Sequence, residues 1–100
     1  MLDENLPRPL KRAFLEHEAR TVQECGFTSL ANGELLARLE GLCDVFVTAD
    51  KNLRYQQNLM GRTLAIVELP TNRLPHLLPH FERISAAVTT AAPGSYTVLD

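Results

Sequence analysis

The sequence predicts an α/β domain with a three-layer α/β/α arrangement, in which helices cover both faces of a mainly parallel sheet of four to five strands. Short runs of β-branched and aromatic residues alternate along the chain with segments whose apolar residues recur at helical spacing. The clearest strand, Val45–Thr48, is apolar at successive positions, as in a sheet covered on both faces. The 100 residues are enough for one domain, 1–100, with its own core.

The first half of the chain contains two predicted strands and two predicted helices. A short strand is expected at Met1–Leu2, and Pro7 then fits the first turn of a helix, because proline lacks the N–H that this turn leaves unpaired. A second short strand is expected at Thr21–Val22, followed by a loop over Cys25–Ala31. The next helix is expected over Asn32–Gly41, with an apolar stripe of leucines.

The second half continues the alternation from the central strand Val45–Thr48. A short helix or turn is expected over Leu53–Leu59, and a further strand over Arg62–Leu69. Leu74–Ala91 predicts an amphipathic helix that two prolines interrupt near its start. Ser95–Leu99 alternates weakly, as an edge strand does.

Composition and motifs exclude several classes of function. The formal net charge of −2 and a pI of about 5.9 argue against tight, non-specific nucleic-acid binding, although local contact with a nucleic acid remains compatible. The sequence has no GxGxxG, P-loop or GxSxG motif, and its two cysteines lack CxxC spacing. No stretch is apolar and long enough to predict a membrane span, and no signal peptide is evident, so a cytoplasmic protein without a membrane partner is expected.

Three acidic residues are expected near one edge of the predicted sheet. Asp3 ends the first strand, Asp50 follows the central strand, and Glu34 lies in the first turn of the second helix. Ligand sites in open α/β sheets gather beyond the carboxyl ends of the strands. Carboxylate oxygens suit Mg²⁺ or Mn²⁺, which can activate a water and stabilise charge on a phosphate. The three carboxylates are therefore candidate metal ligands and catalytic residues.

Each of these residues also has a purely structural interpretation, which spacing alone favours. Asp50 fits the N-cap of a helix that begins near position 51, and Asp3 could cap the first helix. Glu34 favours the positive end of its helix dipole and has i,i+4 spacing to Arg38. Asn32 is by itself a good N-cap.

The segment 51–58, KNLRYQQN, follows Asp50 and has two interpretations. Lys51 and Arg54, with the amides beside them, could contact a phosphate backbone while Tyr55 stacks on a base. Alternatively, the segment is a solvated turn in which Tyr55 packs on the core. Arg8 belongs to a second basic cluster, which is otherwise the polar face of a helix.

Three motifs together resemble a known family. LDENLP at the start, NGELL in the middle and VTADKNL after the central strand resemble the small bacterial PIN-like proteins, a compact branch of the PIN nuclease fold. The resemblance runs from Leu2 to roughly Pro79. It implies a parallel sheet flanked by helices and an acidic pocket that binds Mg²⁺ or Mn²⁺ and cuts RNA. Many such proteins are toxins of toxin–antitoxin pairs, and many form homodimers.

The resemblance assigns roles to individual positions of this chain. It implies that the metal ligands are Asp3, Asp50 and Glu34, that outer or alternative ligands are Glu4, Asn32 and Asn52, and that the phosphate is held by Lys51, Arg54 and Arg8. Asn32 and Asn52 stand where related proteins often carry aspartates, and an amide offers a metal a dipole instead of a full charge.

Two functions of different classes follow. The first is a PIN-like metal-dependent ribonuclease, including the toxin of a toxin–antitoxin pair, with RNA as substrate and an antitoxin protein and a second copy of the chain as partners. The second is a catalytically weak or inactive PIN-like module that binds a partner protein or a nucleic acid. The retained Asp3 and Asp50 favour the first function, whereas Asn32 and Asn52 favour the second.

Overall fold

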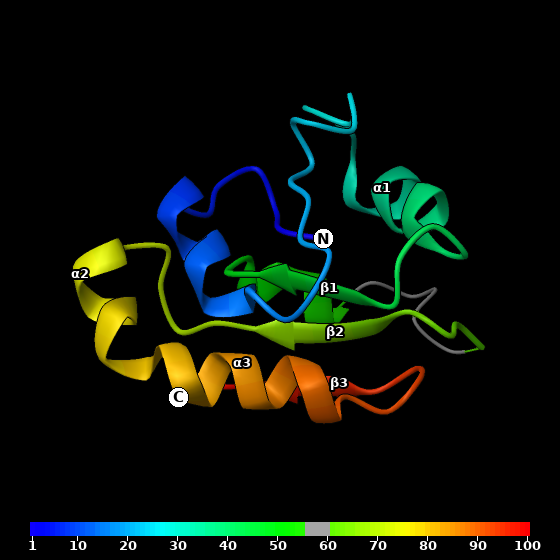
Figure 1. Ribbon diagram of the computed structural model, residues 1–100. Coiled ribbons are helices and arrows are strands. Elements are labelled where there is room, and N and C mark those ends of the chain that lie inside the picture. The colour runs from blue at the N-terminus through cyan, green and yellow to red at the C-terminus, as the bar shows by residue number, and fades with distance from the viewer. Residues whose placement is uncertain (56–60) are drawn as a thin grey trace.

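The computed structural model describes residues 1–55 and 61–100 and shows a small open sheet with helices (Figure 1). From Val45 onward, helices and strands follow one another in the order that the sequence predicts. The elements in chain order are η1 (Arg8–Phe14), α1 (Asn32–Leu39), β1 (Val45–Thr48), η2 (Lys51–Tyr55), β2 (Ala65–Glu68), α2 (Leu74–Leu77), η3 (Leu78–His80), α3 (Phe81–Thr90) and β3 (Tyr96–Val98), where η marks a 3₁₀ helix.

The sheet of the described residues has three parallel strands in the order β1-β2-β3, so the predicted parallel arrangement is confirmed. The register places Thr48 of β1 beside Glu68 of β2, and Glu68 beside Val98 of β3. The two other predicted strands are isolated parallel bridges, in which Leu2 pairs with both Thr21 and β1. Leu2 pairs only through these bridges because a turn begins directly after it. In this turn the N–H of Leu6 donates a hydrogen bond to the carbonyl of Asp3.

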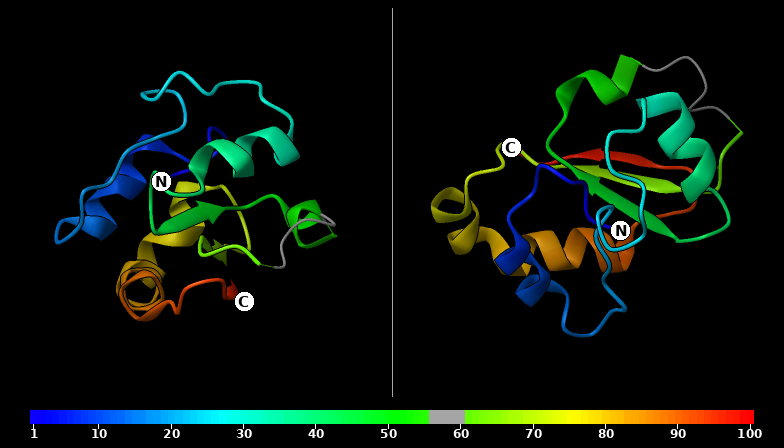
Figure 2. Two further views of the ribbon diagram at one scale, coloured as in Figure 1. Left: turned by 90° about the vertical axis from the view of Figure 1, so that its right-hand side faces the viewer. Right: turned by 90° about the horizontal axis from the view of Figure 1, so that it is seen from above.

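Apolar side chains pack on both faces of the sheet, because successive residues of a strand point to opposite sides. Val47 and Val67 belong to a core cluster that includes residues of η1, α2 and α3. Phe46 and Ile66 belong to a second cluster with α1 and η2. Figure 2 shows α1 and α3 on opposite sides of the strands. Thr48 and Glu68, the polar last residues of β1 and β2, lie two residues after Phe46 and Ile66. Their side chains therefore point to the same face of the sheet as Phe46 and Ile66.

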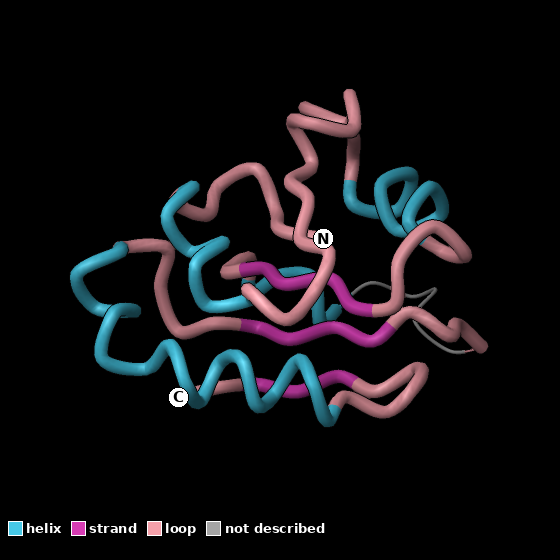
Figure 3. Tube along the Cα trace, viewed as in Figure 1, coloured by secondary structure: helices cyan, strands magenta, loops and turns pink. Residues whose placement is uncertain are grey.

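The helices differ from the predictions in detail. The first predicted helix forms as the 3₁₀ helix η1, with Leu10 and Phe14 buried. The predicted helix Leu74–Ala91 divides into α2, η3 and α3. Figure 3 shows the helical tube changing direction between α2 and α3. Pro79 explains the division, because it lacks the N–H that a continuous helix would use at this position, whereas Pro75 lies in the first turn of α2, where that N–H is unpaired in any case. Within the described residues, no helix combines the length and the apolar character that a membrane span requires.

Candidate functional site at the carboxyl edge of the sheet

Asp3 and Asp50 come together at the carboxyl edge of the sheet through the side chain of Thr48, the last residue of β1. The Thr48 hydroxyl is fully buried and donates a 2.7 Å hydrogen bond to Oδ2 of Asp3. The same hydroxyl accepts a 3.0 Å hydrogen bond from the backbone N–H of Asp50. Asp3 reaches this position because its own N–H bonds to the carbonyl of Val47, which holds it beside β1. The fold therefore links the Asp3 carboxylate to the backbone of Asp50 through one hydroxyl.

Asp3 is a nearly buried carboxylate, with 9% of its surface exposed. Burial raises its pKa above the ordinary value and outweighs the hydrogen bonds from Thr48 and from the N–H of Glu4, which lower it. The negative charges of Glu4 and Asp50 raise this pKa further. A cation bound at Asp3 would relieve both the desolvation and the repulsion. The capping role considered for Asp3 is wrong, since η1 begins after Pro7 without a side-chain cap.

Asp50 has the predicted capping contact and a second contact that spacing alone does not predict. Its Oδ1 accepts a 2.9 Å hydrogen bond from the N–H of Asn52, at the start of η2. Its Oδ2 accepts a 3.1 Å hydrogen bond from Nδ2 of Asn32. The capping role expected of Asn32 is wrong: the N-cap of α1 is Ala31, and no side chain caps this helix. The amide of Asn32 instead turns toward Asp50.

The other two predicted acidic residues have different partners. Glu34 is exposed and forms a 3.4 Å ion pair with Arg38, as its i,i+4 spacing predicts. The Oε1 atom of Glu4 accepts a 3.1 Å hydrogen bond from the N–H of Ser29, and this bond connects Glu4 to the loop before α1. Over residues 1–55 and 61–100, no group of three or more histidine, cysteine, aspartate and glutamate side chains is arranged to hold a metal. The acidic pair that the structure brings together is Asp3 and Asp50.

A buried carboxylate at the end of the next strand forms an ion pair with a partly exposed arginine, and the sequence does not predict this pair. Glu68 ends β2 in register with Thr48 and is 1% exposed. Arg54 of η2 donates to both of its oxygens, from Nε to Oε1 at 3.2 Å and from Nη2 to Oε2. The Tyr96 hydroxyl donates to Oε1 at 2.7 Å. The available signal was a glutamate at the end of the apolar strand AIVEL, because a charge there requires a partner.

The electrostatics of this cluster follow from its hydrogen bonds. Burial alone would raise the pKa of Glu68, but the hydrogen bonds from Arg54 and Tyr96 and the positive charge of Arg54 hold it below the ordinary value. Burial and the bond to the Glu68 carboxylate raise the pKa of Tyr96. Glu68 is thus an anion and Tyr96 a neutral donor across the physiological range.

The remaining predicted phosphate contacts lie on the surface. Lys51 of η2 and Arg8 of η1 are exposed. Tyr55 is 76% exposed, so the expectation that it packs on the core is wrong. The rest of the predicted turn, residues 56–60, lies outside the described residues. The exposed cations and ring are therefore accessible to a ligand.

The edge combines carboxylate, hydroxyl and amide oxygens with nearby cationic side chains, a set suited to a hard divalent cation and a phosphate. No family model, characterised protein or solved structure matches this chain. The chemistry of this edge and the motifs of the sequence are therefore the features that point to a function.

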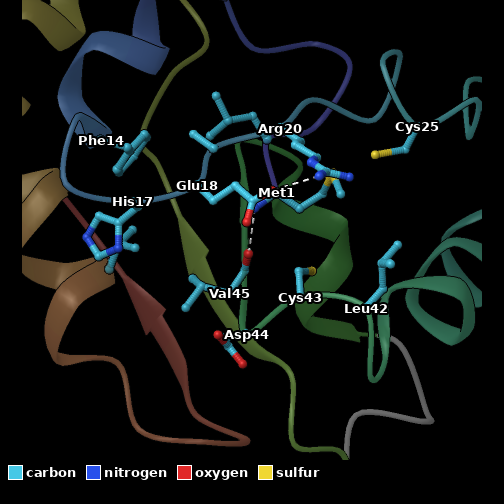
Figure 4. Close-up of a pocket in the computed structure, with 13 residues that line it drawn as sticks. Met1, Phe14, His17, Glu18, Arg20, Cys25, Leu42, Cys43, Asp44 and Val45 are labelled. Atoms are coloured by element: carbon cyan, nitrogen blue, oxygen red, sulfur yellow. Dashed lines mark hydrogen bonds and ion pairs between the residues drawn. The ribbon is translucent and has the colours of Figure 1, made fainter.

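A cavity of about 340 Å³ lies near the amino end of β1, away from these residues (Figure 4). Cys25 and Cys43, both half-buried free thiols, border it together with Arg20 and the first residues of the chain. The N-terminal amine of Met1 donates a 2.9 Å hydrogen bond to the carbonyl of Val45 there, and burial lowers its pKa. None of the predicted site residues borders this cavity.

Proposed function

We propose that the chain is a PIN-like, metal-dependent ribonuclease of three-layer α/β/α architecture that hydrolyses a phosphodiester bond with water. The observation that supports this proposal most directly is the pair Asp3 and Asp50, joined through the Thr48 hydroxyl at the carboxyl edge of the sheet. The raised pKa of Asp3 fits the site to a cation, because an anion that burial disfavours gains most from a positive partner.

Asp3 and Asp50 would hold Mg²⁺ or Mn²⁺, with Glu34 reaching the site after release from Arg38. The ion, when bound, would lower the pKa of a water and neutralise charge that develops on the phosphate. Outer or alternative ligands would be Glu4, Asn32 and Asn52, and the phosphate would be positioned by Lys51, Arg54 and Arg8. The toxin of a toxin–antitoxin pair, acting in the cytoplasm as a homodimer and restrained by an antitoxin, is the form of this proposal that the motifs favour.

A second function is a catalytically weak PIN-like module that binds a partner protein or a nucleic acid. The observation that favours it is the hydrogen bond from Asn32 to Asp50, which satisfies Asp50 without a metal. The ion pair between Glu34 and Arg38 acts in the same direction, since it holds the third carboxylate on the surface of α1.

Calorimetric titration of Mn²⁺ distinguishes the two functions. We expect the native protein to bind the ion, and Asp3→Asn and Asp50→Asn to lose that binding. Glu16→Gln, which removes an exposed carboxylate after η1, is the control and should bind as the native protein does. Cleavage of a labelled RNA should then require Mn²⁺ and both aspartates. If the native protein shows no binding at millimolar Mn²⁺, the nuclease proposal fails and the binding module is supported.

A further inference from the structure

Within the described residues, the guanidinium of Arg54 forms hydrogen bonds with Glu68 along one edge. Glu68 takes Nε and Nη2, so hydrogens on Nη1 and one on Nη2 stay outside this pair. The Arg54 side chain is 39% exposed, whereas that of Glu68 is 1% exposed. The buried carboxylate thus binds one edge of the guanidinium, and the Arg54 side chain stays partly exposed.

Glu68 itself is not available to a metal or a substrate. Oε1 accepts from Arg54 and from the Tyr96 hydroxyl, and Oε2 accepts from Arg54. A carboxylate so buried is tolerated only with a complete set of partners. The role of Glu68 is therefore exerted through the residues that it contacts.

The position of the cluster connects it with the acidic pair. Glu68 lies in register beside Thr48, which binds Asp3. Arg54 is on η2, the helix that Asp50 caps. An unpaired arginine on a protein surface samples many rotamers. An arginine held by bidentate hydrogen bonds presents its remaining N–H donors in a fixed direction.

We propose that Glu68 and Tyr96 are positioning residues that hold Arg54 so that its outer N–H groups bind a phosphate of the substrate beside Asp3 and Asp50. This inference takes from the proposed function that the ligand is a nucleic acid and that Arg54 contacts its phosphate. It goes beyond it by assigning a role to a buried carboxylate and a tyrosine that do not touch the substrate.

The test is whether Glu68→Gln strengthens or weakens the binding of a polyanion. Glu68→Gln removes a negative charge, and simple electrostatics then predicts tighter binding of a polyanion. Positioning predicts the opposite, because Arg54 loses its forked partner and its fixed direction. The probe is a fluorescein-labelled oligouridylate of about ten nucleotides, a length within the range that single-strand sites contact. Binding is measured without divalent metal at several salt concentrations.

We expect Arg54→Ala to weaken binding several-fold and to reduce the salt slope by about 0.7, the value of one contact to a single strand. Glu68→Gln should also weaken binding and reduce the salt slope. The double variant should be no weaker than Arg54→Ala alone, since Glu68 acts through Arg54. Tyr96→Phe removes one donor without altering charge, so it should give a smaller loss and remains informative if Glu68→Gln does not fold.

Cleavage of the same RNA with Mn²⁺ adds a second readout. The variants at positions 54, 68 and 96 should raise KM and leave kcat nearly unchanged, because the contact is made to bound substrate. If both Glu68→Gln and Tyr96→Phe bind as tightly as the native protein or more tightly, the inference is overturned even where cleavage is intact. If the pattern of binding holds but no RNA is cut, the nuclease proposal fails and the positioning role stands.

Discussion

Replacing Thr48 with valine tests whether one hydroxyl organises the acidic pair. Valine has nearly the shape of threonine, so the change leaves no cavity at this fully buried position. It removes the donor to Oδ2 of Asp3 and the acceptor of the Asp50 N–H. We therefore expect a loss of stability that originates in polar groups alone.

The magnitude follows from these two bonds. A hydrogen bond to a charged group contributes about 1.5–3 kcal/mol, and the Asp50 N–H, which is half-buried and within reach of water, adds about 1 kcal/mol. The free energy of unfolding should fall by about 2–4 kcal/mol, which for a domain of this size lowers Tm by roughly 10 °C or more. The assay is urea unfolding followed by circular dichroism. The control is Thr48→Ser, which keeps the hydroxyl and should cost only about 1 kcal/mol for the lost methyl.

The same variant has a predicted pH dependence. The pKa of Asp3 is raised in the folded protein, so between its unfolded and folded values the folded state binds more protons and stability falls as pH rises. Thr48→Val removes a donor that lowers this pKa, and the loss of stability should be larger at about pH 8 than at about pH 4. Equal stability of the valine and serine variants at both pH values would refute the bridging role of the hydroxyl.

Three further predictions concern other contacts. Asn32→Asp places a second carboxylate beside Asp50, so Mn²⁺ affinity should rise in calorimetry while metal-free Tm falls; unchanged affinity would remove position 32 from the site. Hydrogen bonds from Thr63 lower the pKa of Glu40 in the folded protein. Glu40→Gln should therefore reduce stability above the unfolded pKa of this group, and the difference from the native protein should vanish as pH falls through the folded pKa. A pH-independent difference in urea midpoints would contradict this. Gly94→Ala should cost more than 1 kcal/mol beyond Gly26→Ala, since both glycines have positive φ but only at Gly94 would a Cβ lie 2.6 Å from a backbone oxygen; equal Tm values would contradict the clash.

Much of the fold was predictable because it depends on local patterns. The strand Val45–Thr48 has the same bounds in the structure, and the helix predicted from Asn32 ends two residues before Gly41. Both patterns are strong: a β-branched run in one case and a leucine stripe closed by a glycine in the other. The strand count was less predictable, since pairing at Leu2 and Thr21 depends on where turns end the ladder and not on side-chain pattern.

The candidate site was predictable only in part. The carboxyl-edge rule brought Asp3 and Asp50 together, because it depends on strand order and direction alone. It did not reveal the Thr48 bridge or the turn of Asn32 away from its helix, which are set by tertiary contacts over 45 and 18 residues of sequence. The pair of Glu68 and Arg54 spans 14 residues; a glutamate at the end of an apolar strand indicates that it has a partner, but the sequence does not identify Arg54 as that partner.

The capping and metal-binding interpretations of Asp50 are compatible. Capping of η2 uses Oδ1, and the second oxygen faces Asn32, whose amide donates to it. An aspartate at position 32 would repel Asp50 in the absence of metal, whereas the asparagine donates a hydrogen bond to that oxygen. Rotation of the Asn32 amide by half a turn would direct its own oxygen toward a cation and release Asp50. If Asp3 and Asp50 hold a metal as proposed, Asn32 favours the metal-free fold at the cost of affinity, and the Mn²⁺ affinity of the native protein relative to Asn32→Asp measures that balance directly.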